Sequence, residues 1–391
     1  MAHRIRLARA RFLVGFTALF ALAAIPASAQ VTTIEGTTAN GAAYALAVPA
    51  AWNGDLVVYA HGIVDPGAPV ALPSAQDGFA ALEAAWLDLG YAVAYSSFSE
   101  NGYALKSAIQ RTHQLRGLFT AKFRRPSRTY LAGHSLGGLA VLALAEKHPA
   151  QYDGVLPMCT PIGGGAAEIG YLGDARVVFD YFFPGVLPGG PFSVPAGTPF
   201  TPGSSVFNAT LSALATGGLR TLQFAQVAKL PFTSATELVT SGMSVVGFSI
   251  RFTGDVLERT HGHIPFDNLD TVYAGSFDDA ALNDPVTGVE RFVAAPDAAN
   301  YFDHYYTPTG NLRIPTLTLH TLFDPIAPFA HEGHYAATVA GAGASEWLTQ
   351  RSVARYGHCS INAAETMSAF DALVGWVNGG PKPAGGDGTI R

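Results

Sequence analysis

Gly133-His134-Ser135-Leu136-Gly137 is the stretch that decides the fold, because it matches the pattern G-x-S-x-G in a specific context. An apolar, β-prone segment (residues 129–132) leads into it, and a helix-prone segment (residues 139–146) follows it. A turn this tight strains the backbone of its central serine, and only glycine neighbours avoid a steric clash there. The pattern therefore predicts a nucleophile elbow that lifts the Ser135 hydroxyl clear of the backbone. It also puts the Leu136 N–H at a helix N-terminus, where it can face a developing oxyanion.

The first 29 residues have the pattern of a signal peptide. Four arginines precede an apolar run (residues 12–25), and Ala27-Ser28-Ala29 fits a cleavage site. The apolar run is too short for a comfortable membrane span, and no later stretch reaches that length. We therefore expect a protein that is secreted or periplasmic, starts near Gln30 and does not insert stably into a membrane.

The composition argues against nucleic acid as a partner. The chain has 23 Lys and Arg against 29 Asp and Glu, and four of the basic residues lie in the predicted signal peptide. No basic cluster remains that could follow a phosphate backbone. Hydrophobic residues make up 49% of the chain, enough to form a large core without help from metals or many disulfides. The oligomeric state is left open.

Strand-like and helix-like segments alternate in two parts of the chain. In the first part, strands are predicted at residues 44–48, 55–60, 91–98, 129–134 and 154–158, with helices at 79–89, 104–123 and 139–148. In the second part, strands at 316–320 and 347–353 alternate with helices at 329–339 and 362–377. Asn362 and Glu365 suggest a capping box for the last helix. This alternation predicts an α/β fold whose mostly parallel sheet is covered on both faces.

The alternation stops between Pro161 and Ile314, where the chain is rich in Gly, Pro, Phe and Tyr. Loops in α/β crossovers usually have about 2–6 residues, so a break of this length suggests a large insertion over the carboxyl edge of the sheet. An appendage far from the site is the alternative. The expected division is a catalytic domain (30–161 and 314–378), an inserted cap or lid domain (162–313) and a flexible tail (379–391). Phe182 and Phe183 are candidate substrate-binding residues of the cap.

The elbow resembles that of the α/β-hydrolases, in which the partners of the serine follow in the chain order acid, then histidine. A serine hydroxyl needs a base to accept its proton, and the base needs a third group to orient it. Asp324 follows the strand that resumes after the insertion; an ordinary turn aspartate is the alternative interpretation. His358 is the one histidine among 12 in the loop before the last helix. The resemblance implies a triad of Ser135, Asp324 and His358, with Ile63 N–H as the second oxyanion donor beside Leu136.

The two cysteines lie close to these residues in the predicted topology. Cys159 ends the strand after the elbow, and Cys359 directly follows His358. In an exported protein such a pair suggests one disulfide, which would pin the histidine loop to the sheet. Two unpaired buried thiols are the alternative. Closing a loop of about 200 residues contributes on the order of 4–5 kcal/mol in the chain-entropy model.

Together, these segments resemble the α/β-hydrolase superfamily over residues 43–378. The matching positions are the elbow, Ala60-His61-Gly62, Asp324 and Gly357-His358-Cys359. More narrowly, the chain is similar to secreted bacterial serine hydrolases of the esterase, lipase and prolyl-oligopeptidase-like groups. A cysteine beside the catalytic histidine also occurs in tannases and feruloyl esterases. There the partner cysteine adjoins the nucleophile, whereas Cys159 lies 24 residues beyond Ser135.

The resemblance implies a serine hydrolase that cleaves carboxylic esters through an acyl-enzyme and uses neither a metal nor a cofactor. The aromatic, apolar insertion suggests a hydrophobic or aromatic acyl group, because such surface is costly to expose unless it lines a pocket. The ester is a small molecule or a polymer. A serine peptidase and a polyester depolymerase are alternatives within the fold, and a non-catalytic binding protein is the alternative outside enzymes.

Overall fold

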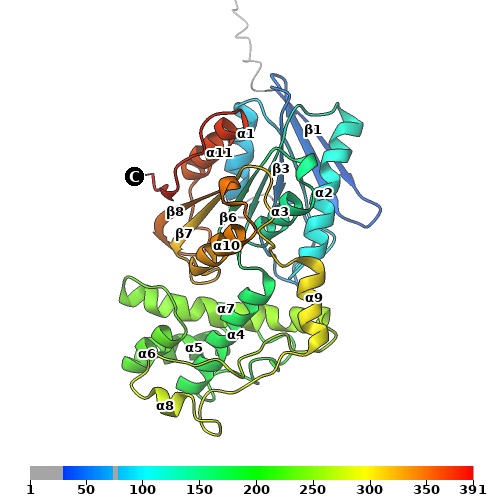
Figure 1. Ribbon diagram of the computed structural model, residues 1–391. Helices are drawn as coiled ribbons and strands as arrows, with labels where there is room; N and C mark the ends of the chain where they lie inside the picture. Colours follow the sequence, from blue (N-terminus) through cyan, green and yellow to red (C-terminus); the bar gives the residue numbers. More distant parts are fainter. Residues whose placement is uncertain (1–29, 74–77, 391) are drawn as a thin grey trace, which may run out of the picture.

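The structure is a computed structural model that describes residues 30–73 and 78–390 (Figure 1). The predicted signal peptide, residues 1–29, lies outside the described residues. Among the helices within the described ranges, none combines the length and the apolar character that crossing a membrane requires.

One mixed sheet forms the centre of the molecule. Within the described residues it has nine strands in the order β1-β2-β4-β3-β5-β6-β7-β8-β9. The pairs β1–β2 and β2–β4 are antiparallel, and the other neighbours are parallel. The predicted α/β class with a mostly parallel sheet is therefore confirmed. The strands are β1 (Val31–Thr37), β2 (Ala43–Pro49), β3 (Leu56–Ala60), β4 (Ala92–Ser96), β5 (Thr129–His134), β6 (Gly154–Met158), β7 (Thr316–Phe323), β8 (Leu348–Tyr356) and β9 (Gly386–Asp387).

Helices cover both faces of the sheet, and the central strands are buried on both sides. In β3, Leu56 and Val58 belong to the core on one face, while Val57 and Tyr59 belong to the core on the other. This follows from the two-residue period of a strand. One face is covered by α2 (Leu105–Lys122), α3 (Leu136–Lys147) and α10 (Ala330–Gly341), and the other by α1 (Phe79–Asp88) and α11 (Ala363–Val377). The predicted capping box at the start of α11 is confirmed.

Between β6 and β7, which are neighbours in the sheet, the chain forms a helical insertion. In Figure 1 the insertion's helices α4 to α8 lie together at one end of the sheet, apart from the helices that cover its faces. They have a core of their own, in which residues of α4, α6 and α7 such as Phe179, Phe224 and Val245 are buried. The helices are α4 (Gly165–Phe182), α5 (Ser205–Thr216), α6 (Leu219–Val227), α7 (Ala235–Arg259), α8 (Asp279–Leu282) and α9 (Pro296–Tyr306).

The tail differs from its prediction. Strand β9 pairs parallel with the outer strand β8, and Gly388 N–H donates a hydrogen bond to Ser352 O at 2.7 Å. Thr349 Oγ1 donates to Pro383 O at 3.1 Å. These contacts cover an edge of the sheet that would otherwise leave backbone groups unpaired. The expectation of a flexible tail over 379–391 is therefore wrong for the residues described, which end at 390.

Candidate active site

Ser135 occupies the turn between β5 and α3 with a backbone φ of 52° and ψ of −121°. A positive φ is strained for a residue with a side chain, and it aims the serine away from the strand. Gly137 makes the turn possible, because a Cβ atom there would overlap the carbonyl oxygens of Ala60 and His61. Leu136 is the first residue of α3, so its N–H has no acceptor within the helix. The elbow therefore has the geometry that the sequence predicts.

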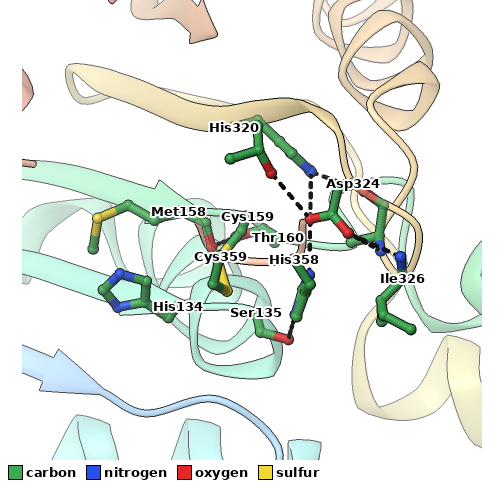
Figure 2. Close-up of a disulfide and its surroundings, with 12 residues drawn as sticks. His134, Ser135, Met158, Cys159, Thr160, His320, Asp324, Ile326, His358 and Cys359 are labelled. Carbon is green, nitrogen blue, oxygen red and sulfur yellow. Dashed lines mark hydrogen bonds and ion pairs between the residues drawn. A yellow bond between two sulfur atoms is a disulfide. The ribbon is translucent and has the colours of Figure 1, made fainter. Parts of the chain in front are cut away.

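Three predicted residues meet at the carboxyl edge of the sheet, as Figure 2 shows. Ser135 Oγ lies 2.9 Å from His358 Nε2, and His358 Nδ1 lies 2.8 Å from Asp324 Oδ2. A carboxylate accepts hydrogen bonds, so Nδ1 carries a proton and donates a hydrogen bond to Asp324. In the neutral ring, Nε2 then has a lone pair that accepts the hydroxyl proton of Ser135. The structure thus brings together the serine, the acid and the histidine that the sequence singles out.

Asp324 is almost completely buried, at 1% exposure. Its Oδ1 accepts hydrogen bonds from the backbone N–H groups of Ile326 at 2.9 Å and Ala327 at 3.0 Å. Burial raises the pKa of this carboxyl, but the charges and hydrogen bonds of His358 and His320 outweigh burial and hold the pKa well below its usual range. Asp324 therefore stays ionised at neutral pH.

His320 is a residue of this site whose role sequence reasoning missed. It lies on β7 and is fully buried behind Asp324, as Figure 2 shows. Its Nδ1 is 3.1 Å from Glu332 Oε1, and its Nε2 is 2.9 Å from Ala327 O and 3.5 Å from Asp324 Oδ2. A backbone carbonyl and an ionised carboxylate can only accept, so both ring nitrogens donate and the imidazole carries a positive charge. Burial alone would lower the pKa of His320, but its two carboxylate partners raise that pKa to about 10.

Glu332, on α10, fixes the far end of this buried network. Thr318 Oγ1 donates to its Oε2 at 2.7 Å, and Gln350 Nε2 donates to the same oxygen at 2.6 Å. With His320 Nδ1 near the other oxygen, three side chains contact this carboxylate and hold it in place. A continuous chain of polar contacts therefore runs from Ser135 through His358, Asp324 and His320 to Glu332. In the sequence, the one signal for this role of His320 is its position four residues before Asp324.

Cys159 and Cys359 form a disulfide beside Ser135, as Figure 2 shows. The Cys159 N–H also donates to Leu319 O of β7 at 2.9 Å, which ties the loop after β6 to the neighbouring strand. Because Cys359 adjoins His358, the bond fixes the loop of the histidine to the sheet. The two sulfurs and the His358 ring are within 4.8 Å of one another. Sulfurs bonded to each other are not thiolates, however, so this group is not a metal site in its oxidised form.

A pocket opens beside the serine, between the sheet and the helical insertion. Its space, counted with the part open to solvent, is about 790 Å³. Ser135, Leu136 and Ile63 line it from the side of the sheet, so both predicted oxyanion donors belong to residues of the pocket wall. The insertion contributes mostly apolar side chains, from Ile169, Leu172, Phe192, Phe248, Phe252 and Val256. A pocket with an apolar wall and a few polar groups is typical of small-molecule sites.

The structure does not place Phe182 and Phe183 at this pocket. Both are buried in the core of the helical insertion, at 8% and 5% exposure. The Phe183 ring packs against Phe179 and Phe224, with centroids 5.1 and 6.3 Å apart. The expectation that these two residues bind substrate is therefore wrong. They lie at the end of α4 and face the other helices of the insertion. An aromatic run in the sequence cannot show which of its residues face this core and which face the pocket.

Comparisons with known proteins give one family match and several similar structures. The family described as "Putative esterase" matches residues 57–173, a stretch that includes β3, the elbow and the start of α4. No curated protein sequence matches the chain. An esterase from Aspergillus oryzae superimposes with a TM-score of 0.51 at 12% identity, over 90% of this chain and 80% of that one. Feruloyl esterase B from the same organism gives 0.49 at 14% identity, over 90% and 81%. The esterase PF2001 of Pyrococcus furiosus gives 0.46 at 12% identity, over 89% and 90%.

The first of these structures shows that the chain has the α/β-hydrolase fold, as the sequence predicts. The family match covers the part of the chain that holds the serine and its turn. The description of this family agrees with carboxylic ester hydrolysis, the class of activity that the resemblance implies.

Proposed function

We propose that this protein is an exported serine hydrolase that cleaves carboxylic esters through an acyl-enzyme. The observation that carries the proposal is the pair of hydrogen bonds that join Ser135 to His358 at 2.9 Å and His358 to Asp324 at 2.8 Å. A serine within reach of a base, which is itself oriented by a buried acid, is the arrangement that nucleophilic catalysis requires.

In this mechanism Ser135 Oγ attacks the ester carbonyl while His358 Nε2 takes its proton. Asp324 stabilises the imidazolium that forms and keeps Nδ1 protonated. The N–H groups of Leu136 and Ile63 donate to the oxyanion of the tetrahedral intermediate. His358 then protonates the departing alkoxide, which leaves the acyl group on Ser135. Water attacks this ester in the second half, with His358 again as the base.

The helical insertion is the cap of this site in our proposal, and its apolar wall selects a hydrophobic or aromatic acyl group. Support comes from the residues of α4 and α7 that line the pocket together with Ser135. Export is supported by the signal-peptide pattern of residues 1–29 and by the disulfide, which persists in oxidising compartments. A small-molecule ester fits a pocket of this size best.

The direct test is labelling of Ser135 with a fluorophosphonate probe, combined with kinetics of Ser135→Ala. The variant should keep its fold and lower kcat for p-nitrophenyl butyrate by about 10³-fold or more. Ser345→Ala, at an exposed serine far along the chain, serves as the matched control and should keep full activity. A Ser135→Ala variant with a tenth of the original activity would refute the proposal, as would a label on another residue.

A further inference from the structure

The wall of the pocket contains buried polar atoms that no protein group satisfies. Among the described residues, Tyr103 Oη, Glu168 Oε2 and Arg176 Nη1 are buried and have no hydrogen-bond partner, and all three residues line the pocket. Buried polar groups in proteins are nearly always paired, because leaving one unpaired destabilises the fold. Arg176 still binds Asp180 and Gly189 through its other nitrogens. Within the described residues, the side chains of Tyr103 and Glu168 have no other hydrogen bond of this kind.

Glu168 lies on the first turns of α4 and is 7% exposed. The nearest basic group is His331 of α10, whose Nδ1 is 3.8 Å from Glu168 Oε2, too far for a hydrogen bond. Burial lowers the pKa of His331 to about 4, so that ring carries no charge at neutral pH. Burial, with the charge of Asp324, raises the pKa of Glu168 well above its usual range, and the positive His320 only partly opposes this. These surroundings favour the neutral form of Glu168, which can both donate and accept a hydrogen bond.

Tyr103 reaches the same part of α4 from the loop before α2. Gly165 allows this approach, because a Cβ atom at that position would overlap the Tyr103 hydroxyl. Gly165 and Glu168 are three residues apart, so they lie on one side of the helix. Burial raises the pKa of Tyr103, with the nearby Tyr301 and Glu168 adding to the effect, so the phenol stays protonated. Tyr103 and Glu168 therefore offer groups that can both donate and accept, in one region of a pocket whose wall is mostly apolar.

We propose that Glu168 and Tyr103 bind a hydroxyl group on the acyl part of the ester. An alcohol donates one hydrogen bond and accepts others, so it satisfies a neutral acid and a phenol at the same time. The apolar remainder of the wall holds the hydrocarbon part of the same acyl group. The substrate class is thus hydroxylated acyl esters, and this inference rests on the proposed ester hydrolysis.

The test compares kcat/KM for ethyl octanoate with that for ethyl 2-, 3- and 8-hydroxyoctanoate. The wild-type protein should prefer at least one hydroxylated ester over ethyl octanoate. Glu168→Leu should lower this preference about tenfold, because the substrate hydroxyl then loses a partner. Glu168→Gln should keep most of the preference, since an amide also donates and accepts. Tyr103→Phe should also lower this preference. Glu258→Gln, at an exposed position of α7, is the control and should leave the preference unchanged.

Labelling of Ser135 in every variant separates this proposal from the proposed function. If Ser135 is labelled but Glu168→Leu and Tyr103→Phe leave the preference unchanged, the hydroxyl site is refuted while ester hydrolysis stands. A wild-type preference for ethyl octanoate over all three hydroxylated esters would also overturn it. So would a stronger preference for an ester of 8-aminooctanoate, because a cation calls for an ionised Glu168.

Discussion

At the residue scale, the chemistry of the site depends on which buried side chains carry charge. Asp324 is ionised, and two histidines contact the same oxygen of its carboxylate, His358 at 2.8 Å and His320 at 3.5 Å. These two rings have different surroundings. His358 contacts the Ser135 hydroxyl on one side, and in the mechanism that we propose it takes and returns the serine proton. His320 faces only acceptors and keeps its proton, so in the mechanism that we propose it is a positioning residue that acts through Asp324.

This difference leads to a prediction about His320→Gln. The folded-state pKa of His320, about 10, lies above the ordinary value near 6.5. Its protonation therefore stabilises the fold fully below about pH 6.5, and this contribution disappears as pH rises through about 10. The difference in free energy of unfolding between wild type and His320→Gln should shrink over that range in urea titrations. Nitrogen-15 NMR of the wild type at pH 8 should show both ring nitrogens of His320 protonated.

His334→Gln is the matched control for this prediction, because His334 is on the same helix as Glu332 but is exposed. Its stability difference from wild type should not vary with pH between 7.5 and 10. A neutral His320 ring at pH 8 would contradict the assignment. An equal pH dependence in both variants would contradict it as well.

At the scale of elements, α4 and α7 connect the fold to the pocket. They pack against each other, and each contributes one side to the core of the insertion and another to the wall beside Ser135. The N-terminus of α7 is capped by Ser234, whose side chain accepts from Glu237 N–H at 3.2 Å. Neither helix is predicted from the sequence. Their glycines, threonines and β-branched residues are poor helix formers, so packing rather than propensity stabilises them.

The two sides of α4 and its neighbours should respond differently to truncation. Phe192→Ala and Phe252→Ala enlarge the pocket, since both rings line it. They should change the ratio of kcat/KM for p-nitrophenyl octanoate to that for the acetate severalfold, because contacts with a long chain are lost. Phe183→Leu should instead lower the thermal midpoint and leave the ratio unaltered, since Phe183 lies in the core. A uniform effect on both esters by the pocket variants would argue that the insertion is not a cap.

At the scale of the whole molecule, the central sheet and the place of the insertion could be predicted, whereas the fold of the insertion could not. The central strands from β3 to β7 are short apolar runs with clear turns between them, and the resemblance to α/β-hydrolases assigns Asp324 and His358 to the ends of β7 and β8. No comparable sequence pattern predicts the helices of the insertion, because their positions depend on how they pack against one another. For the same reason, the sequence cannot show that Phe182 lies in the core of the insertion and not at the pocket. The order of the tail cannot be predicted from its composition, because it depends on pairing of Gly386 with the exposed edge strand β8.

The disulfide joins parts of the molecule that are 200 residues apart in sequence, so its effect belongs to this scale. The two cysteines are the only ones in the chain, and a reductant therefore acts on this bond alone. Opening it should lower the free energy of unfolding by up to about 5 kcal/mol in the chain-entropy model. Since Cys359 adjoins His358, kcat should also fall at temperatures where the reduced protein is still folded. Calorimetry and ester hydrolysis of the oxidised protein, the reduced protein and a Cys159→Ser, Cys359→Ser double variant measure both effects. Free thiols on the protein isolated without reductant would show that the bond does not form in solution. A reduced form with the same thermal midpoint and kcat would show that the bond does not hold the histidine loop in place.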